Sequence, residues 1–317
     1  MFTDLPGLAL ADRAALFTAL RDLDARCTAD VVPVTLGGRP GRFVREPEAA
    51  RAVLTSPEAR KGRPAASLRD LGGYIGLTGS DFAAARADVI AALRASSADG
   101  PTDLVAHLAG TAPDLTAAFG ALRRIADAGA EPDTVEHRAA AVAQLAPRLS
   151  ERSAFVRVLT ERGWDRPRIA AEIVTLAFAG RASLGAATRS GRCLGITGGA
   201  ATDAAVTELF RIAAPGWLVV REYIEDGTLV VLSPWLLHRD PRGWRDPGRF
   251  DPDRTGTRRS PWYLPFSAGP RRCPAETWSR AYLRATLGQL PPSEPAATTR
   301  TVLAEGRSAC LEAEESA

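Results

Sequence analysis

The sequence contains few of the residues that build cysteine- and histidine-based metal clusters. Its 317 residues include four cysteines and three histidines. The histidines lie far apart, and the cysteines have unrelated spacings with no Cys-x-x-Cys pair: Cys27, Cys193, Cys273 and Cys310. Structural zinc sites use closely paired ligands. The spacing therefore gives no indication of a zinc cluster.

Long apolar runs and a strong charge imbalance are also lacking. No stretch approaches the roughly 20 apolar residues that a membrane span requires. The opening residues 1–6 lack the basic-then-apolar layout of a signal peptide, so we expect a cytoplasmic protein without a membrane segment. The formal net charge is +3, and the basic residues form no run with interleaved aromatic residues. Nucleic-acid binding is therefore not expected.

The hydrophobic pattern predicts a mainly α fold with small β elements. At 45% hydrophobic positions, the chain can bury a large core. Helices are expected over residues 12–26, 47–54, 81–94 (with Asp81 as the N-cap), from about 167, over 203–211 and over 274–290. Strands are expected within 31–44, joined at Gly37-Gly38, and over 217–220 and 229–232. We expect an ordered coil over 233–263.

The domain organisation is expected to be simple. A single domain would span residues 1–317. It would have a β-containing part at about 1–60, a helical core at about 61–290 and a C-terminal hairpin or tail at 291–317.

The most informative segment is Phe266-Ser267-Ala268-Gly269-Pro270-Arg271-Arg272-Cys273-Pro274-Ala275, which runs into a predicted helix. Phe266 can shield the sulfur, Gly269 allows close backbone approach, and the arginines and helix start supply positive potential that favours a thiolate. By itself the segment could also be a proline-rich surface turn with a structural cysteine. The order Phe-x-x-Gly-x-Arg-x-Cys-x-Ala resembles the haem-ligand loop of the cytochrome P450 family, in which one cysteine thiolate binds the iron.

Further motifs follow the order found in that family. Glu208 and Arg211 are neighbours on one helical face, although isolated pairs of this kind are common on solvated helices. They resemble the family's Glu-x-x-Arg helix. Arg249, in Asp246-Pro247-Gly248-Arg249-Phe250, resembles the arginine that completes this structural cluster. The resemblance covers about 203–290, with a looser match towards the N-terminus.

The resemblance implies one haem b bound to Cys273. Its two carboxylates would need cationic partners, and arginine binds carboxylate through a planar fork. Arg86, Arg221 and Arg271 match the family by position, although each one alone could be a solvated surface residue. Phe82 stands where relatives have Trp or His, and it cannot donate their hydrogen bond.

The segment Ala179-Gly180-Arg181-Ala182-Ser183 resembles the family's Ala-Gly-x-Asp/Glu-Thr stretch above the iron. Ala179 and Gly180 match, Ser183 keeps a hydroxyl, and Ala182 replaces the acid. In the family, acid and alcohol relay protons during oxygen activation. Ordered water, a polar group of the substrate or Arg181 could compensate. Short connections elsewhere indicate a compact, minimal version of the fold.

The resemblance therefore implies a haem-thiolate oxidoreductase of the monooxygenase type. It would oxidise a small organic substrate, in specialised-metabolite biosynthesis, with electrons from a ferredoxin or flavodoxin. The chain has no flavin or nicotinamide fingerprint. Two alternatives stay open: a peroxide-using peroxygenase in which Arg181 anchors a substrate carboxylate, and a P450-like scaffold without catalytic activity.

Overall fold

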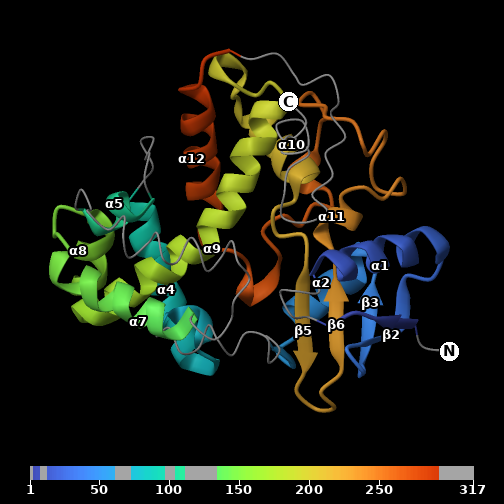
Figure 1. Ribbon diagram of the computed structural model, residues 1–317, viewed down its shortest axis with the longest axis horizontal. Coiled ribbons are helices and arrows are strands. Elements are labelled where there is room, and N and C mark those ends of the chain that lie inside the picture. The colour runs from blue at the N-terminus through green and yellow to red at the C-terminus, as the bar shows by residue number, and fades with distance from the viewer. Residues whose placement is uncertain (1–2, 8–12, 61–72, 97–103, 111–133, 293–317) are drawn as a thin grey trace. The chain divides into compact units, whose positions relative to one another are not determined.

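The computed structural model describes residues 3–7, 13–60, 73–96, 104–110 and 134–292 (Figure 1). The chain divides into two compact units. The first unit comprises residues 1–64, 183–273 and 286–317, and the second comprises 65–182 and 274–285. The single domain expected over 1–317 stays a prediction, and the expected hairpin beyond 292 lies outside the described residues.

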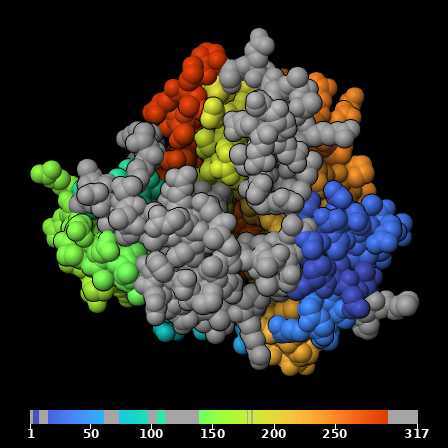
Figure 2. All heavy atoms as spheres, viewed as in Figure 1, coloured from blue at the N-terminus to red at the C-terminus, as the bar shows by residue number. Residues whose placement is uncertain are grey.

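A mixed sheet forms the centre of the first unit. Its described strands are ordered β1-β2-β3-β6-β5-β4. Their bounds are β1 Thr3–Leu5, β2 Val31–Leu36, β3 Arg39–Val44, β4 Ala59–Arg60, β5 Val219–Tyr223 and β6 Leu229–Leu232. Strand β3 pairs with β6 in parallel, with Phe43 opposite Val231. Figure 2 accordingly shows the β2–β3 region (blue) beside the yellow-orange β5–β6 hairpin.

The sequence sets the turn and helix starts around this sheet. Gly37 and Gly38 have φ values of 55° and 77°, which glycine adopts without a Cβ clash, so β2 turns tightly into β3. Helix α2 is capped by the Glu46 carboxylate, which accepts two backbone N–H groups. The described helices lying wholly in this unit are α1 Arg13–Arg26, α2 Pro47–Thr55, η5 Gly198–Ala200, α10 Asp203–Ala213, α11 Pro234–Leu237, η6 Thr257–Arg259 and η7 Gly269–Arg271.

Helices build the second unit around an apolar core. Val89, Leu145 and Phe155 in this core are all 0% exposed, and α4 packs against α8 (Figure 1). The described helices lying wholly in this unit are η3 Tyr74–Gly76, α4 Gly79–Ala95, α5 Leu104–Ala109, α7 Thr134–Leu145, η4 Ala146–Arg148 and α8 Ala154–Glu161. Among the described helices, α9 Arg166–Cys193 and α12 Glu276–Gly288 have residues in both units.

Most expected elements are present, with corrections in two places. The coil expected over 233–263 contains the short helices α11 and η6, and α11 starts at Pro234 because Ser233 caps it through its side chain. The second correction is at the start of α4. The helix begins at Gly79 with Thr78 as its N-cap, so Asp81 lies in the first turn and is not the cap. Gly79 has φ +59°, a conformation that glycine adopts readily, and this turn lets the helix start two residues early. None of the helices in the described ranges is long and apolar enough to span a bilayer.

Candidate haem-thiolate site

Residues 266–273, here called the Cys273 loop, are held by their own main chain. The Cys273 N–H donates to the Phe266 carbonyl at 2.9 Å, and the Arg272 N–H donates to the Gly269 carbonyl at 3.0 Å. Ser267 has φ +64°, which is uncommon for a residue with a side chain. Cys273 is half-buried and forms no disulfide. The loop therefore presents a thiol on a fixed backbone.

Two neighbouring helices hold the Cys273 loop in place. A Cβ on Gly269 would lie 2.2 Å from the Leu54 carbonyl oxygen at the end of α2, so only glycine allows this approach. The Phe266 ring lies 4.7 Å, centroid to centroid, from the Phe210 ring of α10. Gly269 makes the close backbone approach expected of it, and the shielding of the Cys273 sulfur by Phe266 stays a prediction.

Arg221 and Arg271 form a cationic pair within the first unit. Arg221, on β5, is 5% exposed, and its Nη1 donates to the adjacent Val220 carbonyl at 3.0 Å. Burial, followed by the positive charge of Arg271, lowers the pKa of Arg221 to about 10. An anion binding beside the two guanidinium groups would offset both the burial and the repulsion.

Arg86 presents a third guanidinium, within the second unit. It lies on α4, and its Nη1 is buried without a hydrogen-bond partner among the described residues. Buried N–H groups are nearly always paired in native proteins. Arg86 therefore has the donor that a carboxylate ligand would satisfy.

Glu208, Arg211 and Arg254 form a buried ion cluster, here called the Glu208 cluster. Arg211 is 0% exposed and Glu208 1%, and two parallel hydrogen bonds of 2.7 and 2.9 Å join them. Arg254 Nε donates to Glu208 Oε1 at 3.3 Å. Arg211 also donates to the carbonyls of His238, Pro247 and Arg249. The cluster thereby fixes the coil after α11.

The comparisons with known proteins match this arrangement. The family profile described as Cytochrome P450 matches residues 202–290, which contain the Glu208 cluster and the Cys273 loop. The structure of retinoic acid-bound cyanobacterial CYP120A1 is 18% identical, with TM-score 0.69, over 90% of this chain and 91% of that chain. CYP175A1 from Thermus thermophillus is 18% identical, with TM-score 0.64, over 95% and 96%. Residues 202–290 match the cytochrome P450 family, and the fold of the chain is that of P450s.

Curated P450 relatives match over short stretches. Steroid 17-alpha-hydroxylase/17,20 lyase of Equus caballus is 42% identical over 67 residues, which cover 19% of this chain and 13% of that protein. (+)-Piperitol/(+)-sesamin synthase CYP81Q2 of Sesamum radiatum is 36% identical over 69 residues, 21% and 14%. The chain thus spans about one seventh of these relatives' length. The predicted fold, mainly helical with a small mixed sheet, is confirmed as that of P450s.

The contacts of Glu208 lead to a correction for Arg249. Among the contacts of the described residues, the Arg249 guanidinium makes none to Glu208, and Arg254 supplies the second cation. The reason is the turn that begins at Asp246, whose carbonyl accepts the Arg249 N–H at 3.0 Å. This turn brings the Arg249 carbonyl to Arg211, while the Arg249 side chain is exposed.

The segment predicted to be distal, residues 179–183, lies on α9, which is helical without interruption from Arg166 to Cys193. Ala179 is exposed, and Gly180 and Ser183 are half-buried. Ala179 and Ser183 are four residues apart and therefore share a helix face. The side chains of Arg181 and Ala182 lie outside the described residues. The catalytic roles of Ala179, Gly180 and Ser183 stay predictions.

His238 connects the Glu208 cluster to the Cys273 loop. It is 0% exposed, its Nε2 accepts the Leu264 N–H, and its Nδ1 lies 2.9 Å from the Arg211 carbonyl. Because Nε2 is the acceptor, the neutral ring carries its hydrogen on Nδ1 and donates it to Arg211. Burial lowers the pKa of His238 to about 3. Leu264 is two residues before Phe266, so this histidine helps to set the path of the loop.

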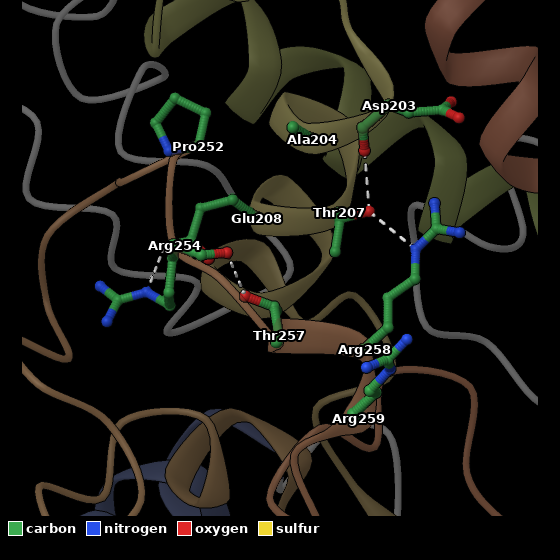
Figure 3. A pocket seen from close by; sticks show the side chains of 10 residues that line it. Asp203, Ala204, Thr207, Glu208, Pro252, Arg254, Thr257, Arg258 and Arg259 are labelled. Atoms are coloured by element: carbon green, nitrogen blue, oxygen red, sulfur yellow. Dashed lines mark hydrogen bonds and ion pairs between the residues drawn. The ribbon is translucent and has the colours of Figure 1, made fainter.

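An open pocket of about 510 Å³ lies over the Glu208 cluster (Figure 3). It is lined by Asp203, Ala204, Thr207, Glu208, Pro252, Arg254, Gly256, Thr257, Arg258 and Arg259. Arg258 reaches towards Thr207 (Figure 3), with its Nε donating to Thr207 Oγ1 at 3.1 Å. Cys273, Arg221 and Arg271 do not line it, so this pocket is separate from the residues proposed for haem.

Proposed function

We propose that this P450 is a haem-thiolate oxidoreductase of the monooxygenase type, with Cys273 as the iron ligand and a small organic molecule as substrate. The observation that carries the proposal is the Cys273 loop. Its thiol lies on a backbone fixed by the Phe266 carbonyl and the close approach of Gly269 to Leu54. A loop with this order of residues and no binding role would not need such close packing.

The residues present fit haem b in each unit taken separately. The first unit offers the Cys273 thiol and the Arg221–Arg271 pair, whose electrostatics favour an anion. The second offers the partnerless Arg86 Nη1. Cys273 would bind the iron, and the three arginines would bind the two carboxylates. When bound, haem supplies the oxidising chemistry, and the protein supplies positioning and electrostatics.

Ser183 and Gly180 are the residues proposed to act on the distal side. Ser183 Oγ can hold a water molecule or pass on a proton, and Gly180 leaves space beside α9. Ala182 supplies no proton, so water or a polar group of the substrate would take the place of the family's acid. We propose that this difference restricts the enzyme to a specialised biosynthetic oxidation.

An acidic ferredoxin or flavodoxin is the proposed electron donor. Positive residues near the cysteine in the sequence, Arg272, Arg280 and Arg284, would attract it. Arg280 is not a simple surface charge, because it is 7% exposed and pairs with Glu276 at 3.3 Å. Arg272 and Arg284 stay as candidates for this role.

Peroxide as the oxidant is the second candidate function. Ala182 in place of the family's acid favours it, because a substrate carboxylate anchored by Arg181 could supply the missing acid. Turnover with hydrogen peroxide and no reductase would support this candidate. Strict dependence on an electron donor would support the monooxygenase.

The central test is the absorption spectrum of the reduced carbon monoxide adduct. The protein should show the strongly red-shifted Soret band of thiolate ligation, and Cys273→Ser should lose it. Cys27→Ser is the matched control, because Cys27 is the other described cysteine outside a disulfide. A histidine-type spectrum, or no uptake of haem by the folded protein, would overturn the proposal.

A further inference from the structure

Glu172 is a buried carboxyl group on α9 that none of the roles above uses. Its side chain is 0% exposed, and Oε2 accepts the Tyr74 N–H at 2.8 Å. Oε1 has no hydrogen-bond partner within the described ranges. Burial raises the pKa of Glu172 to about 7, while the Tyr74 N–H and Arg168 act in the opposite direction. An apolar side chain at position 172 would avoid the free-energy cost of burying a carboxyl group. The presence of Glu172 therefore indicates a role for its contact with Tyr74.

The main chain at residues 73–74 is attached to α9 at two adjacent points. The first is the hydrogen bond from Tyr74 to Glu172. The second is the close approach of the Gly73 backbone to Thr175: a Cβ at position 73 would lie only 2.6 Å from Thr175 Oγ1. Thr175 is three residues after Glu172, on the same helix face. Together, these contacts fix where η3 begins.

The position of η3 is passed on to α4 through two aromatic rings. The Tyr74 and Phe82 ring centroids are 5.8 Å apart, and both residues are buried. Arg86 follows Phe82 by four residues, so the two side chains are neighbours on α4. Its Nη1 is the partnerless buried donor described above.

We propose that Glu172 is a positioning residue for Arg86: by holding the Tyr74 N–H, it keeps the Tyr74 ring against Phe82 and thereby fixes the turn of α4 that carries the guanidinium. The Phe82 side chain cannot form a hydrogen bond to Arg86. The position of Arg86 is therefore set by the packing of Phe82 against Tyr74. The inference rests on the proposed function in one respect, because Arg86 matters to catalysis only as a haem partner.

Hydrogen exchange of the Tyr74 amide tests the first link. Glu172→Gln keeps a carbonyl acceptor and should leave the exchange rate within about two-fold, whereas Glu172→Leu removes the acceptor and should raise it about ten-fold or more. Thr175→Val is the matched control on the same face: it keeps the shape that packs against Gly73 and removes only the hydroxyl bonded to the Ala171 carbonyl, so an unchanged rate is expected. Equal exchange in the Gln and Leu variants would overturn the inference.

The second link is tested by modification of Arg86 with phenylglyoxal, followed by mass spectrometry on the haem-free protein. Glu172→Leu and Tyr74→Leu should both change the Arg86 rate several-fold, and Glu172→Gln should restore it. Tyr74→Leu keeps the amide and removes the ring, so it serves if Glu172→Leu does not fold. An unchanged Arg86 rate in a folded variant would overturn the inference.

Haem release from the loaded protein separates the inference from the proposed function. Glu172→Leu should accelerate release about ten-fold, and this effect should disappear in an Arg86→Leu background, because coupled residues are non-additive. The same acceleration in both backgrounds would mean a general loss of stability and would overturn the inference. Failure to bind haem at all would overturn the proposed function, while the exchange and modification results would still decide the role of Glu172.

Discussion

Replacing His238 by Gln should change how stability depends on pH. The folded protein holds the imidazole neutral, with its pKa lowered by burial from 6.5 to about 3. In the unfolded chain, the histidine takes up a proton as the pH falls below about 6.5. The stability contributed by the neutral ring is therefore fully present above that pH and is lost as the pH falls towards 3. At about 1.4 kcal/mol per pH unit, the whole window amounts to roughly 5 kcal/mol.

Urea unfolding of wild type and His238→Gln at two pH values measures this effect. Between about pH 7.5 and about pH 5, the stability advantage of the wild type should shrink by roughly 2 kcal/mol. Trp244→Phe is the control, because Trp244 donates a buried hydrogen bond to the Leu237 carbonyl and does not titrate. Its stability difference should be constant with pH. The same His238 difference at both pH values would show that the ring is not held neutral.

Three further changes have defined outcomes. Glu172→Gln should become more stable relative to wild type by roughly 3 kcal/mol as the pH rises from 4.5 to 7. The reason is that the raised pKa of Glu172 keeps the folded wild type protonated at pH values where the unfolded chain has already lost this proton. Equal pH profiles of the two proteins in urea unfolding would contradict this. Glu208→Gln should lower the free energy of unfolding by about 3–5 kcal/mol, because Arg211 would keep a buried charge; a loss below about 1 kcal/mol would refute it. Gly269→Ala should lower the free energy of unfolding by roughly 2–5 kcal/mol and reduce the amount of thiolate-bound haem, because φ at Gly269 is +69° and Leu54 lies too close for a Cβ. Gly248→Ala is the control: a Cβ there would have nothing within 4 Å, so both measurements should stay unchanged.

Local patterns in the sequence predicted most of the described elements. The β2–β3 turn followed from Gly37-Gly38, and α10 followed from its helical spacing. Arg254 could not be predicted from the sequence as the second cation of the Glu208 cluster. It lies in a coil without periodicity, and 46 positions separate it from Glu208. Coil side chains are directed by turns such as the one at Asp246, and such turns depend on tertiary contacts.

Two other residues were missed for different reasons. Glu172 left a signal, since it is an acid within the apolar stretch of α9, and a search for lone charges in buried helices would have found it. His238 lies in the stretch 233–263, which was expected to be an ordered coil. Its role depends on a donor and an acceptor 26 and 27 positions away, which sequence spacing does not reveal.

The packing of Gly269 against Leu54 has a consequence for how the protein folds. The Cys273 loop needs the end of α2, more than 200 positions earlier, and also the His238 contact with Leu264. Closing such long loops is slow. The Cys273 loop should therefore reach its final shape late, after α2 and the C-terminal part of the chain have met. A C-terminal fragment containing Cys273 should be unable to form the loop alone.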